Sequence, residues 1–200
     1  PSYQFIKALL NNEKGLHIDK DHFMTISPDE GSMNRAIYLA NVLGVDMGMY
    51  YKRLDYSRYV NGRHPIAAYE FLGPKIEGKD MILIDDMISS GDTIIKIASL
   101  LKEKGAGRVY ICSTFGFFTD GLDKFDDAYK KGYFDKLLTT NLVYQSPELL
   151  EKPYYISCDM SKYIALIIDT LNHDNSVSHL LNPVDRIKRC VTNYMSQHEK

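Results

Sequence analysis

Residues 81–93, MILIDDMISSGDT, constrain the fold of this chain more than any other segment. They begin with four apolar residues, 81–84, a run typical of a strand that is covered on both faces of a parallel sheet. Asp85 and Asp86 end the strand, and a loop of small residues follows. From Thr93 onward, apolar residues recur at helical spacing. The segment therefore predicts a strand, a tight loop and a helix of an α/β fold.

The loop of this segment has the composition of an anion-binding turn. It consists of Ser89, Ser90, Gly91, Asp92 and Thr93. The start of a helix offers unpaired N–H groups and a partial positive charge, so a phosphate fits there. Two carboxylates beside it can accept hydrogen bonds from sugar hydroxyls, which makes a phosphorylated sugar a fitting ligand. The alternative is an ordinary turn in which Ser90 or Asp92 caps the helix and both acids are solvated.

Strand-like and helix-like runs alternate along the chain, which predicts an α/β fold with a mainly parallel central sheet flanked by helices. The predicted strands are 22–27, 45–51, 81–86, 108–114, 136–140 and 154–158. The predicted helices are 2–11, 32–43, 93–104, 121–131 and 159–172. From 183 to 200, apolar residues at helical intervals indicate a tail that docks either on the domain or on a partner.

A second loop of this kind, SPDEGS at 27–32, also lies between a predicted strand and a predicted helix. Ligands of open α/β sheets bind at such carboxyl ends of strands. The candidate residues of the loop are Ser27, Asp29, Gly31 and Ser32. Asp29 could ligate a divalent ion that in turn holds a phosphate chain. The alternative is a proline turn whose acidic residues stabilise a helix start.

The third candidate, residues 50–69, combines several tyrosines with cations that include Lys52, Arg53, Arg58 and Arg63. It reads as a mobile basic loop. Such a loop can neutralise the charge that spreads over a transferred phosphoryl or diphosphoryl group. The alternative is a solvated loop without a catalytic role.

Composition excludes several function classes. The chain has 200 residues, 44% of them hydrophobic, which suits one well-packed domain with a modest tail. A net charge of −2 gives no electrostatic footprint for nucleic acid, and no segment reads as a membrane span or a signal peptide. We expect a cytoplasmic protein. Three widely spaced cysteines support neither a disulfide framework nor a zinc site, and Cys112 and Cys158 are expected to be buried.

Taken together and in this order, the three segments resemble those of the ribose-phosphate diphosphokinases, over about residues 24–181. Residues 81–93 resemble that family's ribose-5-phosphate loop, and residues 27–32 resemble its pyrophosphate loop. Lys52 and Arg53 resemble the start of its catalytic loop. RVYICSTFGFFTDG at 108–121 and SVSHLL at 176–181 continue the likeness, and the loop at 81–93 also marks the wider type I phosphoribosyltransferase fold.

The resemblance implies transfer of diphosphate from ATP to ribose 5-phosphate, with Mg²⁺ as cofactor, in a homo-oligomer that binds no nucleic acid or membrane. It implies catalytic roles for Lys52 and Arg53 and a magnesium ligand in Asp29. The residues that would bind ribose 5-phosphate are Asp85, Asp86, Ser89, Ser90, Gly91, Asp92 and Thr93. Those of the pyrophosphate loop are Ser27, Asp29, Gly31 and Ser32.

The chain departs from the family pattern at several positions. Asp92 adds a negative charge beside the phosphate, Leu54 stands where the family has an arginine, and Phe115 replaces a histidine. The resemblance covers the C-terminal half of the family, so we expect residues 1–182 to form that half and the isolated chain to be inactive. Two alternatives stay open: a phosphoribosyltransferase acting on a base, and a regulatory subunit without catalysis.

Overall fold

A single sheet of seven strands organises the molecule, and all predicted strands are part of it. The computed structural model describes residues 1–59, 62 and 64–198. The strands are β1 (Phe23–Ser27), β2 (Asp46–Leu54), β3 (Ile66–Leu72), β4 (Asp80–Ile88), β5 (Val109–Gly116), β6 (Lys136–Thr140) and β7 (Tyr155–Cys158). Their order is β3-β2-β1-β4-β5-β6-β7, and β3 runs antiparallel to β2 while the others pair in parallel. The predicted fold class is confirmed.

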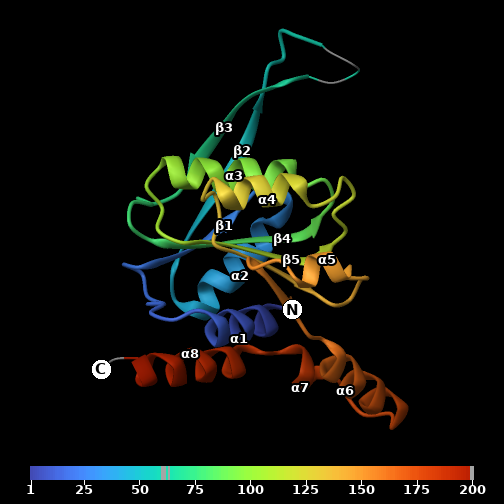
Figure 1. The fold of residues 1–200 in the computed structure, drawn as a ribbon. Coiled ribbons are helices and arrows are strands. Elements are labelled where there is room, and N and C mark those ends of the chain that lie inside the picture. The colour runs from blue at the N-terminus through green and yellow to red at the C-terminus, as the bar shows by residue number, and fades with distance from the viewer. Residues whose placement is uncertain (60–61, 63, 199–200) are drawn as a thin grey trace.

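Helices cover both faces of the sheet (Figure 1). They are α1 (Ser2–Asn12), α2 (Met33–Leu43), α3 (Asp92–Glu103), α4 (Asp123–Lys130), α5 (Pro147–Leu150), α6 (Ser161–Asn172), α7 (Ser178–Leu181) and α8 (Val184–His198). A short 3-10 helix, η1 (Glu30–Ser32), precedes α2. One hydrophobic core lies between the sheet and α3 and α4, and a second lies between the sheet and α1, α2 and α8. The central strand β4 is buried on both faces because its odd and even residues supply different cores.

The segment at 50–69 differs from the predicted mobile loop. Strand β2 continues to Leu54 and β3 returns antiparallel beside it, so residues 50–54 and 66–69 of the segment lie in the strands of a hairpin that projects from the body of the molecule (Figure 1). The predicted strand 45–51 runs three residues further than expected, because Lys52 and Arg53 interrupt the apolar pattern without ending the strand. Arg63, one of the cations of this segment, lies outside the described residues.

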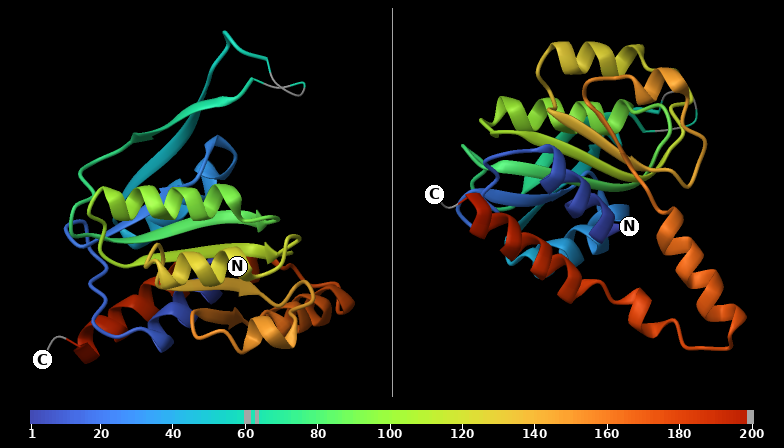
Figure 2. Two further views of the ribbon diagram at one scale, coloured as in Figure 1. Left: turned by 45° about the horizontal axis from the view of Figure 1, so that its top comes forward. Right: turned by 60° about the horizontal axis from the view of Figure 1, so that its bottom comes forward.

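The C-terminal tail docks on the domain. Ile187 and Tyr194 of α8 are buried against α1, and the Tyr194 hydroxyl donates to the Glu13 carbonyl at 2.9 Å. Helix α6 behaves differently, because none of its residues, all of which are described, is buried. It extends away from the rest of the molecule (Figure 2).

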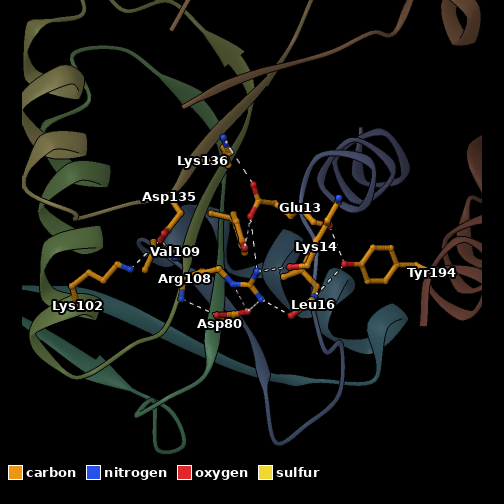
Figure 3. A network of polar contacts seen from close by, with 12 residues as sticks. Glu13, Lys14, Leu16, Asp80, Lys102, Arg108, Val109, Asp135, Lys136 and Tyr194 are labelled. Carbon is orange, nitrogen blue, oxygen red and sulfur yellow. Dashed lines mark hydrogen bonds and ion pairs between the residues drawn. The ribbon is translucent and has the colours of Figure 1, made fainter. Parts of the chain in front are cut away.

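A polar network joins the amino ends of the parallel strands to the segment after α1 (Figure 3). Arg108 donates to Asp80 at 2.6 Å and to the carbonyl oxygens of Lys14 and Gly15 at 2.9 and 2.8 Å. Tyr110, whose pKa is raised by burial, donates to Glu13. These contacts lie at the sheet edge opposite the carboxyl ends, so they hold the scaffold and leave the other edge open.

Candidate functional site

The two acidic loops lie side by side at the carboxyl edge of the sheet. Because β1 and β4 are parallel neighbours, the segments that follow them leave the sheet at the same edge. Together they line a cavity of about 320 Å³. Its lining residues are Asp29, Gly31, Ser32, Asp85, Asp86, Met87, Ile88, Ser89, Ser90, Gly91, Asp92, Thr93 and Ile94. All predicted ribose-5-phosphate residues are among them, and the pyrophosphate-loop residues are too except Ser27.

Asp85 connects the two loops. The Ser32 hydroxyl donates to Asp85 Oδ1 at 2.6 Å, and the Asp86 amide donates to the same oxygen at 2.8 Å. Burial raises the pKa of the Asp85 carboxyl above its ordinary value, and the negative charge of Asp29 raises it further. A half-buried carboxylate at this position is stabilised by further hydrogen-bond donors or by a positive charge. Sugar hydroxyls can supply the hydrogen bonds.

Asp86 is held more loosely and faces the α2 side of the cavity. Its carboxylate accepts from the Met87 amide at 2.8 Å and from Arg35 of α2 at 3.3 Å. Both side chains of the Asp86–Arg35 pair are 43% exposed, so the pair can rearrange when a ligand binds. The sequence pattern gave no reason to select Arg35.

The loop before α3 has the backbone of an anion-binding turn. Gly91 occupies the N-cap position with φ +84° and has no side chain to cap the helix. A Cβ at Gly91 would lie 2.3 Å from Cζ of Phe125, so only glycine fits. The ordinary-turn alternative is therefore partly correct, since the Ser90 hydroxyl accepts from the Asp92 amide at 3.4 Å, although neither Ser90 nor Asp92 occupies the N-cap position. This contact is long, and the N-cap residue Gly91 has no side chain that could compete with a ligand for the amides of the first turn.

Asp92 is the first residue of α3 and forms an ion pair that the sequence analysis missed. Its Oδ1 accepts from Lys124 of α4 at 2.8 Å, and its Oδ2 accepts from the Ser90 hydroxyl at 2.9 Å. Lys124 also contacts Asp120 at 2.9 Å. The pKa of Asp92 is lowered, first by Lys124 and then by Ser90. The i,i+4 spacing of Asp120 and Lys124 was visible in the sequence, but their proximity to α3 depends on how α4 packs.

The loop 27–32 is fixed by its own hydrogen bonds. Asp29 caps η1 by accepting from the amides of Gly31 and Ser32 at 3.0 and 3.3 Å. The buried Ser27 hydroxyl donates to the Asp29 carbonyl at 2.7 Å, so it holds the backbone of the loop from its buried side. The helix-start alternative for this loop is thus partly correct, since Asp29 does stabilise a helix start. Its carboxylate nonetheless lines the cavity.

Strand β2 delivers one of its two cations to the site. Lys52 Nζ lies 3.3 Å from the Thr93 hydroxyl, at the beginning of α3. Arg53 points to the other face of the strand, as the twofold alternation of side chains requires, and pairs with Glu70 of β3 at 2.6 Å. The structure therefore brings Lys52 to the predicted site and does not bring Arg53 there.

The described residues contain no group of three or more histidine, cysteine or acidic side chains arranged to hold a metal ion by themselves. Magnesium rarely uses such a cage, because it is commonly held by one or two carboxylates together with water and substrate phosphates. The mutual repulsion of Asp29 and Asp85 across the cavity is the kind of charge that a divalent cation relieves. The donor set therefore fits a magnesium ion that arrives with a phosphorylated ligand.

Comparison with known proteins identifies relatives of the chain. The ribose-phosphate pyrophosphokinase of Vibrio parahaemolyticus is 29% identical over 163 residues, which cover 81% of this chain and 49% of that protein. That of Thermococcus kodakarensis is 31% identical over 121 residues, covering 60% of this chain and 39% of that protein. The chain thus spans about half the length, or less, of these curated relatives.

A solved structure agrees with the predicted fold. Phosphoribosylpyrophosphate synthetase from Mycobacterium smegmatis superposes with a TM-score of 0.67 at 21% identity, over 87% of this chain and 51% of that chain. The model of the phosphoribosyl synthetase-associated domain matches residues 63–182. This chain therefore belongs to the phosphoribosyl synthetase-associated domain family and is related to the ribose-phosphate pyrophosphokinases.

Proposed function

We propose that this chain is the half of a ribose-phosphate diphosphokinase that binds ribose 5-phosphate and the diphosphate of ATP. The observation that carries the proposal is the shared cavity of the two acidic loops, with the start of α3, whose N-cap residue is Gly91, at its wall. In the reaction, the anomeric hydroxyl of ribose 5-phosphate attacks the β-phosphorus of ATP. The diphosphoryl group is transferred and AMP leaves.

The two halves of ribose 5-phosphate match two parts of the cavity. The 5-phosphate would accept hydrogen bonds from the amides at the start of α3, where the helix dipole favours an anion. Asp85 and Asp86 would accept hydrogen bonds from the ribose hydroxyls. The Ser32–Asp85 hydrogen bond of 2.6 Å supports this arrangement, because it orients the carboxylate before the sugar arrives.

Asp29 would hold the magnesium ion, with Asp85 as the nearest second carboxylate. When bound, the ion neutralises charge on the diphosphate. The amides of Gly31 and Ser32 already donate to Asp29, so on that side the diphosphate would be held through the ion and not by these amides. We therefore place the diphosphate between this loop and Lys52.

Lys52 would stabilise the charge that develops on the diphosphoryl group during transfer. Its ammonium group lies next to Thr93, so it can reach both the phosphate at α3 and the group being transferred. Catalysis of this kind consists mainly of positioning and charge neutralisation. ATP as the donor, a homo-oligomeric assembly and a cytoplasmic location belong to the same proposal.

A regulatory subunit without catalysis is the second candidate. Arg53 is engaged with Glu70 on the far face of β2, and Leu54 stands where an arginine was expected. Lys52 is consequently the one cation that the described part of β2 directs at the cavity. Such a protein would bind ribose 5-phosphate but would not transfer diphosphate in any assembly.

Calorimetric titration of the 200-residue chain with ribose 5-phosphate tests the proposed site. We expect binding that Asp85→Asn weakens for ribose 5-phosphate and leaves nearly unchanged for inorganic phosphate, because Asp85 would contact only the sugar. Asp169→Asn on α6, outside the cavity, is the matched control. Absence of binding to the unmodified chain, or equal effects of both variants, would contradict the site.

The reaction itself requires a separate measurement in a form of the protein that also supplies the half its relatives possess. Formation of 5-phosphoribosyl-1-pyrophosphate from ATP and ribose 5-phosphate would support the diphosphokinase. Binding of ribose 5-phosphate without turnover in that form would favour the regulatory subunit.

A further inference from the structure

Asp92 creates an electrostatic problem for the proposed phosphate site. It is the first residue of α3, its side chain is 69% exposed, and it lines the cavity. The helix dipole favours an acidic residue at this position when nothing is bound. A phosphate dianion at the same helix start would instead be repelled by the carboxylate. Asp92 does not cap the helix, so capping does not account for its presence.

A lysine of α4 pairs with Asp92. Lys124 contacts Asp92 Oδ1 at 2.8 Å while Ser90 donates to Oδ2 at 2.9 Å, so both oxygens of the carboxylate are engaged. Asp92, in turn, is the first cause of the raised pKa of Lys124, and both groups are charged at neutral pH. We propose that Lys124 is a positioning residue that neutralises Asp92 and thereby allows the start of α3 to accept a phosphate. This inference rests on the proposed function.

The region around Lys124 is joined to the phosphate loop by further contacts. The Thr119 amide donates to the Ser89 carbonyl at 3.1 Å, and the hydroxyls of these two residues lie 3.2 Å apart. Asp120, the next residue, holds Lys124 from the other side at 2.9 Å. The segment that precedes α4 is therefore hydrogen-bonded to the loop 89–93. With Lys52 on Thr93, two ammonium groups flank the first turn of α3.

An exposed ion pair of this kind contributes little to folding stability. A purely structural role for Lys124 thus predicts almost no effect of its removal on either stability or binding. The neutralising role predicts that phosphate binding suffers because Asp92 is left uncompensated. It also predicts that removing the Asp92 charge restores binding, which a structural role does not.

The test is a double-mutant cycle on the 200-residue chain, titrated with ribose 5-phosphate and with inorganic phosphate. Lys124→Met should weaken binding of both ligands by about tenfold, since a charge-assisted contact has been replaced by repulsion. Lys124→Met combined with Asp92→Asn should return to within about threefold of the unmodified chain, because the variants are coupled. Lys124→Arg should bind like the unmodified chain, and high salt should shrink the effect of Lys124→Met.

Lys130→Met is the matched control, because Lys130 lies on the same helix and pairs with Asp127 at 3.9 Å, outside the cavity. It should leave binding unchanged. Unchanged binding in Lys124→Met, or a double variant as weak as Lys124→Met alone, would overturn the inference and leave the proposed function standing. Failure of the unmodified chain to bind either ligand would overturn both. Thermal unfolding verifies that each variant is folded, and Lys124→Gln replaces Lys124→Met if that variant is not.

Discussion

At the scale of single residues, the loop that precedes α3 restricts which residue can occupy position 91. Gly91 adopts φ +84°, and the ring of Phe125 occupies the space in which a Cβ at position 91 would lie. Gly121 has a similar φ of +78°, yet nothing lies within 4 Å of its would-be Cβ. The two glycines therefore separate the cost of a left-handed backbone from the cost of a steric clash.

We expect Gly91→Ala to lower the free energy of unfolding by about 3 kcal/mol, because left-handed strain and overpacking against Phe125 add together. Gly121→Ala should cost only about 1 kcal/mol, because only the backbone strain is present. Urea denaturation of both variants measures the difference. Equal losses would show that the contact with Phe125 does not constrain the loop.

Asp85 should make the fold less stable as pH rises. Its pKa is raised in the folded state by burial and then by Asp29, so the folded chain binds this proton more tightly than the unfolded chain. Unfolding free energy should therefore fall as pH rises from the ordinary aspartate value of 3.8 through the raised value, and stay lower above it.

Asp85→Asn should remove that component and increase stability at neutral pH, since an amide carries no charge to desolvate. Asp92→Asn should instead lower the free energy of unfolding at neutral pH, because the pKa of Asp92 is lowered and its charge is favourable in the folded state. Chemical denaturation between pH 3 and pH 7 compares the two variants. A less stable Asp85→Asn at neutral pH would show that the Ser32–Asp85 hydrogen bond outweighs desolvation.

At the scale of elements, the hairpin of β2 and β3 decides which cations can act. A strand alternates its side chains, so adjacent cations at 52 and 53 cannot both face the cavity. A flexible loop would have allowed both to do so. The antiparallel pairing of β2 with β3 removes that freedom up to Leu54.

This division predicts different effects of two neighbouring substitutions. Lys52→Ala should weaken the binding of inorganic diphosphate to the chain by about tenfold, the loss typical of one charge-assisted hydrogen bond. Arg53→Ala should change it by less than about twofold, because Arg53 pairs with Glu70 on the other face. Calorimetry on both variants decides between them. An equal loss in both would mean that the hairpin rearranges when diphosphate binds.

At the scale of the molecule, the chain is a well-packed domain with one open edge. Two hydrophobic cores and the network around Arg108 secure the sheet, and α8 covers α1. The described residues include no helix long and apolar enough to cross a membrane. The chain nonetheless spans only about half the length of its relatives.

We therefore expect the 200-residue chain alone to bind ribose 5-phosphate but to form no 5-phosphoribosyl-1-pyrophosphate from it and ATP. Positioning of both substrates is the main source of the rate in this type of reaction, and half of a site cannot supply it. A radiolabelled phosphate-transfer assay with the isolated chain tests this. Robust turnover would show that the nucleotide is held within these residues.

The sequence by itself predicted six of the seven strands, the helices α1, α2, α3, α4 and α6, and the two acidic loops. These features depend on local periodicity and on positions such as 91, whose left-handed and crowded backbone only glycine suits. Tertiary structure decided three other features: the formation of β3, the face of β2 on which Arg53 lies, and the docking of α8. The pairing of Lys124 with Asp92 is of the same kind, since its partners are 32 residues apart in the chain. Side chains so far apart meet only through helix packing, which no local pattern encodes.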